Sequence, residues 1–234
     1  MASVGTLCTT LLVQDGHPLL LSLHICRLQY FGRIIGSELD VEWLKNSLNS
    51  FLKVLQNGVL RIEMSELGKV SFSTRMVPSQ GVLTWKYYLE EGSELSNLKR
   101  VERVGWNRDK NQHQVDVLVL HTKENLYLEC CIGNLLIYKN ATRQWYTPPL
   151  SKPILPGIMR SVLLSHAPQY GVLIHERAVS VQESDSLYLT NAVRGTVSLS
   201  NDGPQAQILQ QILSDVDESL ALEHFAWCLN QLNR

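Results

Sequence analysis

A mixed α/β (α+β) fold in two domains is predicted by three observations. Short runs rich in β-branched and aromatic residues alternate with stretches whose apolar residues recur at helical spacing. A polar, turn-rich segment at residues 89–97 interrupts this pattern and is typical of a connector between domains. More strands than helices follow it. We expect a small N-terminal sheet-and-helix domain over residues 1–90, a connector over 91–98 and a larger β-rich C-terminal domain over 99–234.

The composition is that of a globular protein without a strong electrostatic signature. The 234 residues include 21 basic and 22 acidic side chains, and the net charge of −1 predicts neither a nucleic-acid partner nor a membrane partner. The longest apolar run is too short to span a bilayer and no signal peptide is evident, so we expect a cytoplasmic protein. Five cysteines without Cys-x-x-Cys spacing predict reduced thiols, with no disulfide framework and no metal site.

A β-hairpin and an amphipathic helix are the first elements expected. Residues 9–14 have strand composition, the Asp15-Gly16 pair is typical of a hairpin turn, and residues 18–21 can return as a second strand. Beyond Ser22 the apolar residues recur near helical spacing, and Gly36 supplies a stop.

A second helix and three strands complete the expected N-terminal domain. Asp40 can cap a helix whose apolar residues recur from Val41 to Leu55. Because the following segments have strand composition, we expect one sheet packed against the helices, with strands at residues 59–64, 69–74 and 81–88.

The C-terminal domain is expected to be a sheet followed by helices. A helical stretch should run from Lys99 to about Asn107, and a proline-rich loop should precede the next helix. Strands are expected at residues 115–121, 125–129, 133–138, 145–147, 171–176 and 186–190, and helices at 157–167, 205–213 and 218–232.

The segment Tyr-Leu-Glu-Cys-Cys-Ile-Gly-Asn at residues 127–134 is the most informative of the chain. Together with Lys99 upstream and Leu-Pro-Gly-Ile-Met-Arg at 155–160, it resembles the active-site segments of the class IV pyridoxal-phosphate enzymes, the aminotransferase class IV family. Its paired cysteines resemble aminodeoxychorismate lyase most. Further segments match in order along the chain, namely Thr9-Thr10 and residues 24–28, 56–60 and 189–195.

This resemblance implies the two-domain class IV fold, pyridoxal 5'-phosphate as cofactor, a small-molecule substrate and a homodimer. Two departures from the family pattern are visible. The strand hairpin that members carry before the first strand is absent, so the N-terminal hairpin is shortened. The loop that supplies a substrate-carboxylate arginine reads here as Gly68-Lys-Val-Ser-Phe72, which leaves Lys69 or Arg75 as the expected contact.

Lys99 and Glu129 are the expected catalytic residues. A lone lysine is usually solvated, but the resemblance assigns Lys99 to covalent attachment of the cofactor, and the nearby Arg100 and Arg103 would lower its pKa. A lone glutamate at a strand end is usually a rim residue, whereas the family uses it to keep the pyridine nitrogen protonated. The resemblance favours the functional interpretation of both. Cys130 and Cys131 are expected to pack beside the cofactor, not to act as nucleophiles.

The cofactor phosphate is expected to contact one arginine and two backbone segments. Arg27 corresponds to the family's phosphate-contacting arginine, whose planar fork suits a phosphate. Ile158 and Met159 open a helix, where free amides and the helix dipole favour an anion. Asn191 and Ala192 resemble the second phosphate loop. The alternative for both segments is that these residues only start a helix or form a turn, without a role in phosphate binding.

Thr10, or its neighbour Thr9, is the expected aid to proton delivery onto the leaving group, with strand packing as the alternative role. His24 is expected to be a structural histidine that a neighbour satisfies.

The resemblance implies an aminodeoxychorismate lyase that converts 4-amino-4-deoxychorismate to 4-aminobenzoate and pyruvate for folate biosynthesis. Two alternatives stay open. One is a class IV aminotransferase for D-amino acids or branched-chain amino acids. The other is a non-catalytic or repurposed homologue, which the shortened N-terminal domain suggests.

Lys99 is the only lysine at the position that the family uses for covalent attachment. We predict that borohydride reduction of the protein with pyridoxal 5'-phosphate attaches the cofactor to Lys99 irreversibly. Peptide mapping by mass spectrometry locates the label, and a label on Lys110 or Lys123 would reject the assignment.

Overall fold

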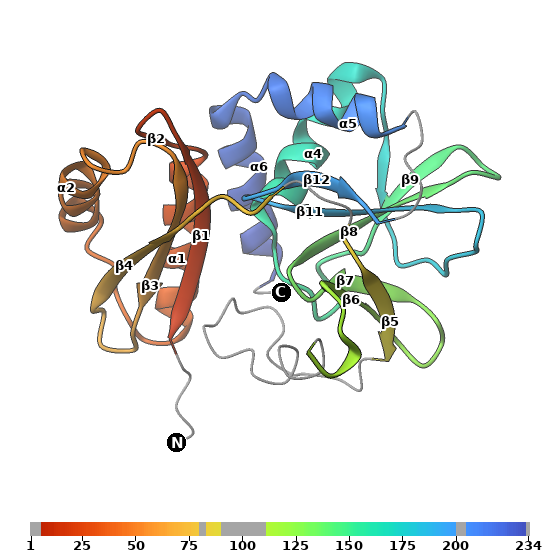
Figure 1. The fold of residues 1–234 in the computed structure, drawn as a ribbon, viewed down its shortest axis with the longest axis horizontal. Coiled ribbons are helices and arrows are strands. Elements are labelled where there is room, and N and C mark those ends of the chain that lie inside the picture. The colour runs from red at the N-terminus through yellow and green to blue at the C-terminus, as the bar shows by residue number, and fades with distance from the viewer. Residues whose placement is uncertain (1–5, 80–82, 90–110, 200–204, 233–234) are drawn as a thin grey trace. The chain divides into compact units, whose positions relative to one another are not determined.

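The computed structural model describes residues 6–79, 83–89, 111–199 and 205–232. The chain separates into two compact units, and the described part of the first unit is residues 6–79. The remaining described residues form the second unit. Figure 1 shows the elements of each. Lys99 and the expected helix that begins there lie outside the described residues.

The N-terminal unit is a four-stranded sheet with the order β2-β1-β3-β4 and two helices. β1 pairs antiparallel with β3, and β3 pairs antiparallel with β4. From Thr9 to Gln14 of β1 the buried residues alternate with less buried ones, so one face of the sheet lies under the helices. The elements are β1 (Leu7–Gln14), β2 (His17–Pro18), α1 (Leu21–Ile34), α2 (Val41–Leu52), β3 (Gly58–Met64) and β4 (Val70–Arg75).

Local sequence accounts for where these elements begin and end. The turn after β1 uses Asp15 and Gly16, both with positive φ, and Gly36 with φ of 74° follows α1. Asp40 caps α2, because its carboxylate accepts a hydrogen bond from the Trp43 amide at 2.9 Å. β2 spans only two residues, which is shorter than the expected strand.

The C-terminal unit contains a mixed sheet with the strand order β10-β9-β8-β7-β6-β5, and β11 pairs with β8 and β12. Its described core includes two clusters of apolar side chains. One contains Leu118, Cys130 and Leu187, and the other contains Leu136, Leu163 and Ile212. The elements are β5 (Trp85–Leu89), β6 (Val117–His121), β7 (Tyr127–Cys130), β8 (Gly133–Lys139), β9 (Gln144–Thr147), α4 (Ile158–His166), η1 (Ala167–Tyr170), β10 (Ile174–Glu176), β11 (Ser186–Asn191), β12 (Gly195–Ser198), α5 (Gln205–Ser214) and α6 (Glu218–Gln231).

Helices α4, α5 and α6 gather along one side of this sheet (Figure 1). Leu163 of α4 and Ile212 of α5 pack there against Leu136 of β8. This side of the sheet is therefore the one on which the loop leading to α4 must lie. Within the described ranges, no helix has the length and apolar character needed to cross a membrane.

The small N-terminal sheet and the larger β-rich sheet confirm the expected fold class. One strand assignment was wrong. β5 was expected in the N-terminal sheet, but it pairs in parallel with β6 in the large sheet. Strand composition does not identify the partner of a strand, and parallel pairing needs a crossover of about a dozen residues or more. β12 was not expected at all.

Candidate active site

The hairpin of β7 and β8 places the two polar residues of the most informative segment side by side. Its turn has two residues, Cys131 and Ile132, so Cys130 pairs with Gly133 and Glu129 pairs with Asn134. Cross-strand partners share one face of a sheet. With a two-residue turn, residues five positions apart lie opposite each other, so the spacing from Glu129 to Asn134 makes them cross-strand partners. Asn134 also pairs with Thr190 of β11, which extends the polar row to a third strand.

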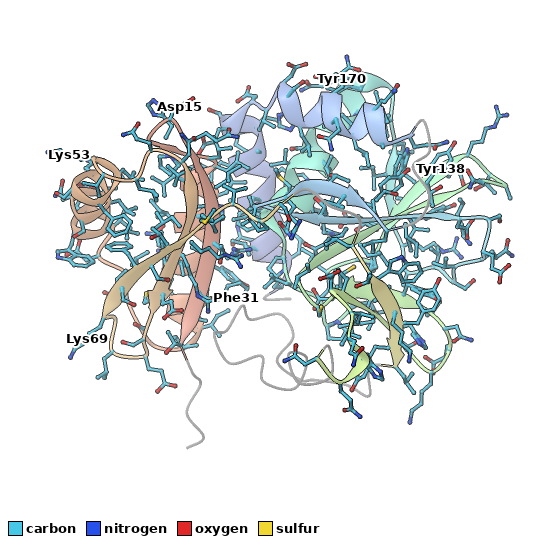
Figure 2. The ribbon with its side chains drawn as sticks, in the orientation of Figure 1. Asp15, Phe31, Lys53, Lys69, Tyr138 and Tyr170 are labelled. Carbon is cyan, nitrogen blue, oxygen red and sulfur yellow. The ribbon has the colours of Figure 1, made fainter. Side chains whose placement is uncertain are left out.

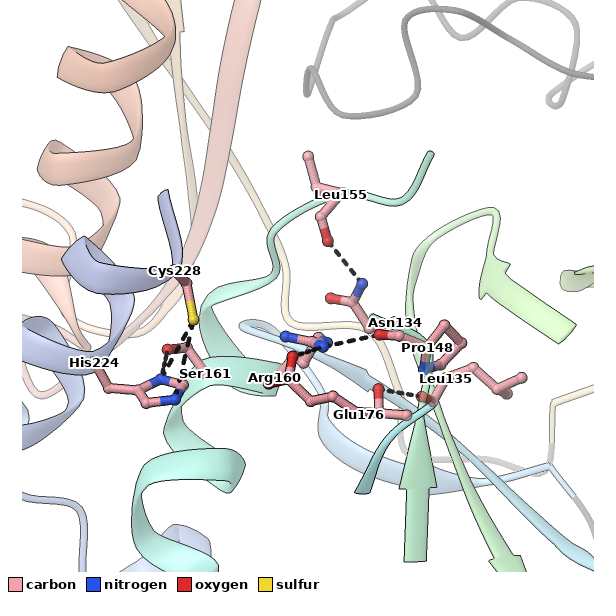
Figure 3. Close-up of polar contacts among 10 residues, drawn as sticks. Asn134, Leu135, Pro148, Leu155, Arg160, Ser161, Glu176, His224 and Cys228 are labelled. Carbon is pink, nitrogen blue, oxygen red and sulfur yellow. Dashed lines mark hydrogen bonds and ion pairs between the residues drawn. The ribbon is translucent and has the colours of Figure 1, made fainter. Parts of the chain in front are cut away.

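All three residues of this row are buried, with exposures of 2% for Glu129, 2% for Asn134 and 1% for Thr190. A buried polar group is costly unless it forms hydrogen bonds. The Leu155 amide donates to Glu129 Oε2 at 3.1 Å, and Asn134 Nδ2 donates to the Leu155 carbonyl at 2.8 Å. Figure 3 shows the second of these bonds. The two side chains thus bind both backbone groups of one residue in the loop before α4.

Helix α4 begins directly after this loop. Gly157 is its N-cap residue and makes no side-chain capping bond. The first amides of a helix have no partner within the helix, and Ser161 is the first whose amide reaches back, to the Gly157 carbonyl at 3.1 Å. The amides of Ile158 and Met159 are therefore placed to bind an anion. The Ile158 side chain is apolar, so any contact of this residue with an anion would come from its backbone amide.

Side chains in α4 fix the orientation of the helix. Arg160 Nη2 donates to the Pro148 carbonyl at 2.8 Å and to Glu176 Oε1 at 2.5 Å. The next residue, Ser161, contacts His224 Nδ1 of α6 at 2.7 Å (Figure 3). Burial lowers the pKa of His224, so its imidazole stays neutral near pH 7 and this contact carries no charge. No sequence pattern indicates these anchors, because their partners are far away in the chain.

Asn191 and Ala192 form a tight loop after β11. Asn191 Oδ1 accepts from the amides of Val193 and Arg194 at 3.0 and 2.9 Å, and its Nδ2 donates to the Ile132 carbonyl at 3.2 Å. These bonds occupy the Asn191 side chain within the protein. Any contact of this loop with an anion would therefore come from its backbone. The bond to Ile132 also ties the loop to the turn between β7 and β8.

Arg27 and Thr9 form a buried polar cluster in the N-terminal unit. Arg27 Nη2 donates to Thr9 Oγ1 at 2.6 Å, and His24 Nδ1 lies 2.6 Å from the same oxygen. Thr9, His24 and Arg27 have exposures of 0%, 0% and 3%. The face of β1 that carries Thr9 therefore lies against α1, and the Thr9 hydroxyl is used in packing this helix onto the sheet.

Thr10 lies on the opposite face of the same sheet, because successive side chains of a strand alternate. Its register partner on β3 is Arg61, which forms an ion pair with Glu63 at 2.6 Å. Arg61 is a cation that was not among the expected site residues. The signal was the polar alternation of Arg61 and Glu63 within an otherwise apolar strand. Arg75 of β4 is exposed on this face as well.

Lys69 is exposed in the turn between β3 and β4, where its amide binds Ser65 Oγ at 3.2 Å (Figure 2). Lys99 is not among the described residues. Of the other expected site residues, Glu129, Ile158, Met159, Asn191 and Ala192 belong to the C-terminal unit, whereas Thr10 and Arg27 belong to the N-terminal unit.

The paired cysteines are buried. Cys130 is completely buried in an apolar cluster, and burial raises the pKa of its thiol well above the ordinary value. Cys131 Sγ accepts from the Leu118 amide at 3.3 Å. Both side chains therefore act as packing residues of the hairpin. The part of the chain that the structure describes contains no group of three or more side chains able to hold a metal ion.

Comparisons with known proteins give a family and a fold. The family model described as amino-transferase class IV matches residues 6–201. The structure is similar to 4-amino-4-deoxychorismate lyase from Pseudomonas aeruginosa, with 23% identity, a TM-score of 0.73 and 90% of each chain covered. It is also similar to a fold IV transaminase from Curtobacterium pusillum, with 14% identity, a TM-score of 0.73, and 93% of this chain and 86% of that chain covered.

A third similar structure is the PLP-bound form of a hypothetical aminotransferase from Mycobacterium tuberculosis. It has 17% identity, a TM-score of 0.78, and coverage of 90% of this chain and 88% of that chain. No curated protein gives a significant match to this chain.

The two threonines of β1 provide a test of the buried cluster. We predict that Thr9→Val destabilises the protein by about 1–3 kcal/mol, because Arg27 and His24 lose a shared hydrogen-bonding partner while the shape is kept. Thr10→Val, on the open face of the same strand, should change the free energy of unfolding by less than about 0.5 kcal/mol. Urea unfolding measures both. Equal effects would contradict the assignment of Thr9 to the buried face.

Proposed function

The chain belongs to the amino-transferase class IV family, and we propose that it acts as an aminodeoxychorismate lyase, converting 4-amino-4-deoxychorismate to 4-aminobenzoate and pyruvate. Enzymes of this family depend on pyridoxal 5'-phosphate, and this chain is one of these enzymes. The observation that carries the proposal is the hairpin in which Glu129 and Asn134 flank the paired cysteines, since this Glu-Cys-Cys-x-x-Asn segment is the one that most resembles the lyase.

The residues of the C-terminal unit fit the cofactor. A phosphate needs backbone donors, and the start of α4 offers amides that no side chain of the described residues caps. A protonated pyridine nitrogen needs a carboxylate that is shielded from water, and Glu129 is 2% exposed. Leu155 connects these two features, because it binds Glu129 and lies two residues before the N-cap residue Gly157.

When bound, pyridoxal 5'-phosphate withdraws electrons from the substrate carbon that carries the amine. In the proposed reaction Glu129 holds the proton on the pyridine nitrogen, and the amides of Ile158 and Met159 bind the phosphate together with Asn191 and Ala192. Lys99 attaches the cofactor and takes the proton from the amine-bearing carbon.

The residues of the N-terminal unit complete the proposed assignment. Arg27 contributes a charged contact to the cofactor phosphate, and Thr10 assists proton delivery to the departing enolpyruvyl group. The buried Arg27 is held in one orientation by Thr9, which suits a fixed contact. The substrate carries two carboxylates, and we assign Lys69 or Arg75 to one of them. A cytoplasmic homodimer that supplies 4-aminobenzoate for folate biosynthesis completes the proposal.

Glu129→Gln tests the role of the buried carboxylate. The substitution keeps the shape and removes the charge, so we predict retained cofactor and a turnover reduced on the order of a hundredfold or more. Glu124→Gln, in the exposed turn before β7, is the matched control and should turn over normally. Turnover of Glu129→Gln at the wild-type rate would contradict the proposed role.

The reaction type has its own test. A lyase needs no amino acceptor, whereas a transaminase stops after one half-reaction without a 2-oxo acid. We predict that aminodeoxychorismate yields 4-aminobenzoate and pyruvate in equal amounts over many turnovers with no 2-oxo acid added. Raising the ionic strength should weaken the apparent affinity if Lys69 or Arg75 contacts the dianionic substrate.

Chromatography of the products distinguishes the alternatives. Amino transfer from D-alanine or a branched-chain amino acid to 2-oxoglutarate, without 4-aminobenzoate, would identify a transaminase, to which the similar structures from Curtobacterium and Mycobacterium also point. Absence of both activities with cofactor bound would identify a non-catalytic homologue.

A further inference from the structure

Asn134 has no assigned role in the proposed reaction, yet its side chain makes two specific contacts. Its Nδ2 atom donates to the Leu155 carbonyl at 2.8 Å. The backbone amide of Leu155 in turn donates to Glu129 Oε2 at 3.1 Å. Leu155 is thus bound on both sides by a cross-strand pair. The amide and the carbonyl of Leu155 belong to adjacent peptide planes, and the backbone angles between these planes are restricted because Pro156 follows. The contact of Asn134 therefore affects how Glu129 is oriented.

The second contact is with the start of α4. A Cβ atom on Gly157 would lie 1.6 Å from Asn134 Oδ1 and 2.8 Å from its Cγ, distances at which two atoms cannot coexist. The next nearest atom is Arg160 Cβ at 3.6 Å, which is an ordinary contact. The side-chain amide of Asn134 is therefore the group that requires glycine at position 157. Asn134 lies between Leu155 and the N-cap residue of the helix.

We propose that Asn134 and Gly157 together form a positioning device for the cofactor, which sets the start of α4 relative to Glu129. The cofactor is a rigid ring with a pyridine nitrogen and a phosphate at different positions, so its two protein contacts must be held at a matching separation. Asn134 acts through the backbone of Leu155 and Gly157 and need not touch the cofactor. This inference rests on the cofactor-binding roles proposed above and is independent of the lyase reaction.

A double-mutant cycle tests the coupling, with the affinity of the apoprotein for pyridoxal 5'-phosphate as the readout. Absorbance titration without substrate measures this affinity, so a failed lyase assay leaves the result interpretable. Asn134→Ala should weaken cofactor binding at least about tenfold. Gly157→Ala should do the same alone, because its methyl group displaces the Asn134 amide. In the Asn134→Ala background, Gly157→Ala should cost less than about twofold, because the methyl group then has space.

Asn140→Ala is the matched control, since Asn140 lies in the exposed turn after β8, and it should leave the affinity unchanged. Urea unfolding checks that each apoprotein is folded. Additive losses in the double variant would overturn the coupling, since Gly157 would then act only by admitting the phosphate. Unchanged affinity in Asn134→Ala would overturn the positioning role.

Asn134→Asp keeps the test decisive if the alanine variants do not fold. It preserves shape but replaces the amide donor with an oxygen that faces the Leu155 carbonyl. Its loss of affinity relative to the wild type should shrink as the pH falls from about 8 to about 5, because a protonated carboxyl group can donate again. A relative affinity that does not change with pH would overturn the role of Asn134 as a donor.

Discussion

Antiparallel pairing of Glu129 with Asn134 across a two-residue turn is the constraint on which the candidate site depends. The pairing places both side chains on the side of the sheet that α4 covers, where they bind the amide and the carbonyl of Leu155. The same turn binds the loop after β11 through the Ile132 carbonyl. Both proposed phosphate-binding segments are therefore attached to one hairpin, and their positions follow from its register.

Burial explains why these polar side chains are bound by other protein atoms. A carboxylate, an amide and a guanidinium that are almost fully removed from water must each be bound by protein atoms. Glu129 and Arg160 meet this requirement with backbone and side-chain partners that also locate the loop before α4 and the helix itself. In the N-terminal unit, Thr9 serves Arg27 and His24 in the same way. Stability and positioning of the proposed site therefore depend on the same bonds.

Similarity to both a lyase and transaminases reflects a fold that supports several reactions. Such a fold supplies the cofactor site, and the reaction depends on side chains elsewhere. In this chain the face of the small sheet opposite α1 carries Arg61 and Arg75, and Lys69 is exposed in the turn between β3 and β4.

Local chemistry makes three features predictable from the amino-acid sequence: the turn at Asp15-Gly16, the Asp40 cap and the hairpin spacing from Glu129 to Asn134. The sequence also carried the family resemblance. Packing in three dimensions is needed to see that β5 joins the large sheet, that Thr9 and not Thr10 faces α1, and that Asn134 excludes a side chain at Gly157. These outcomes depend on which faces pack together, and strand alternation specifies two faces without saying which one is buried.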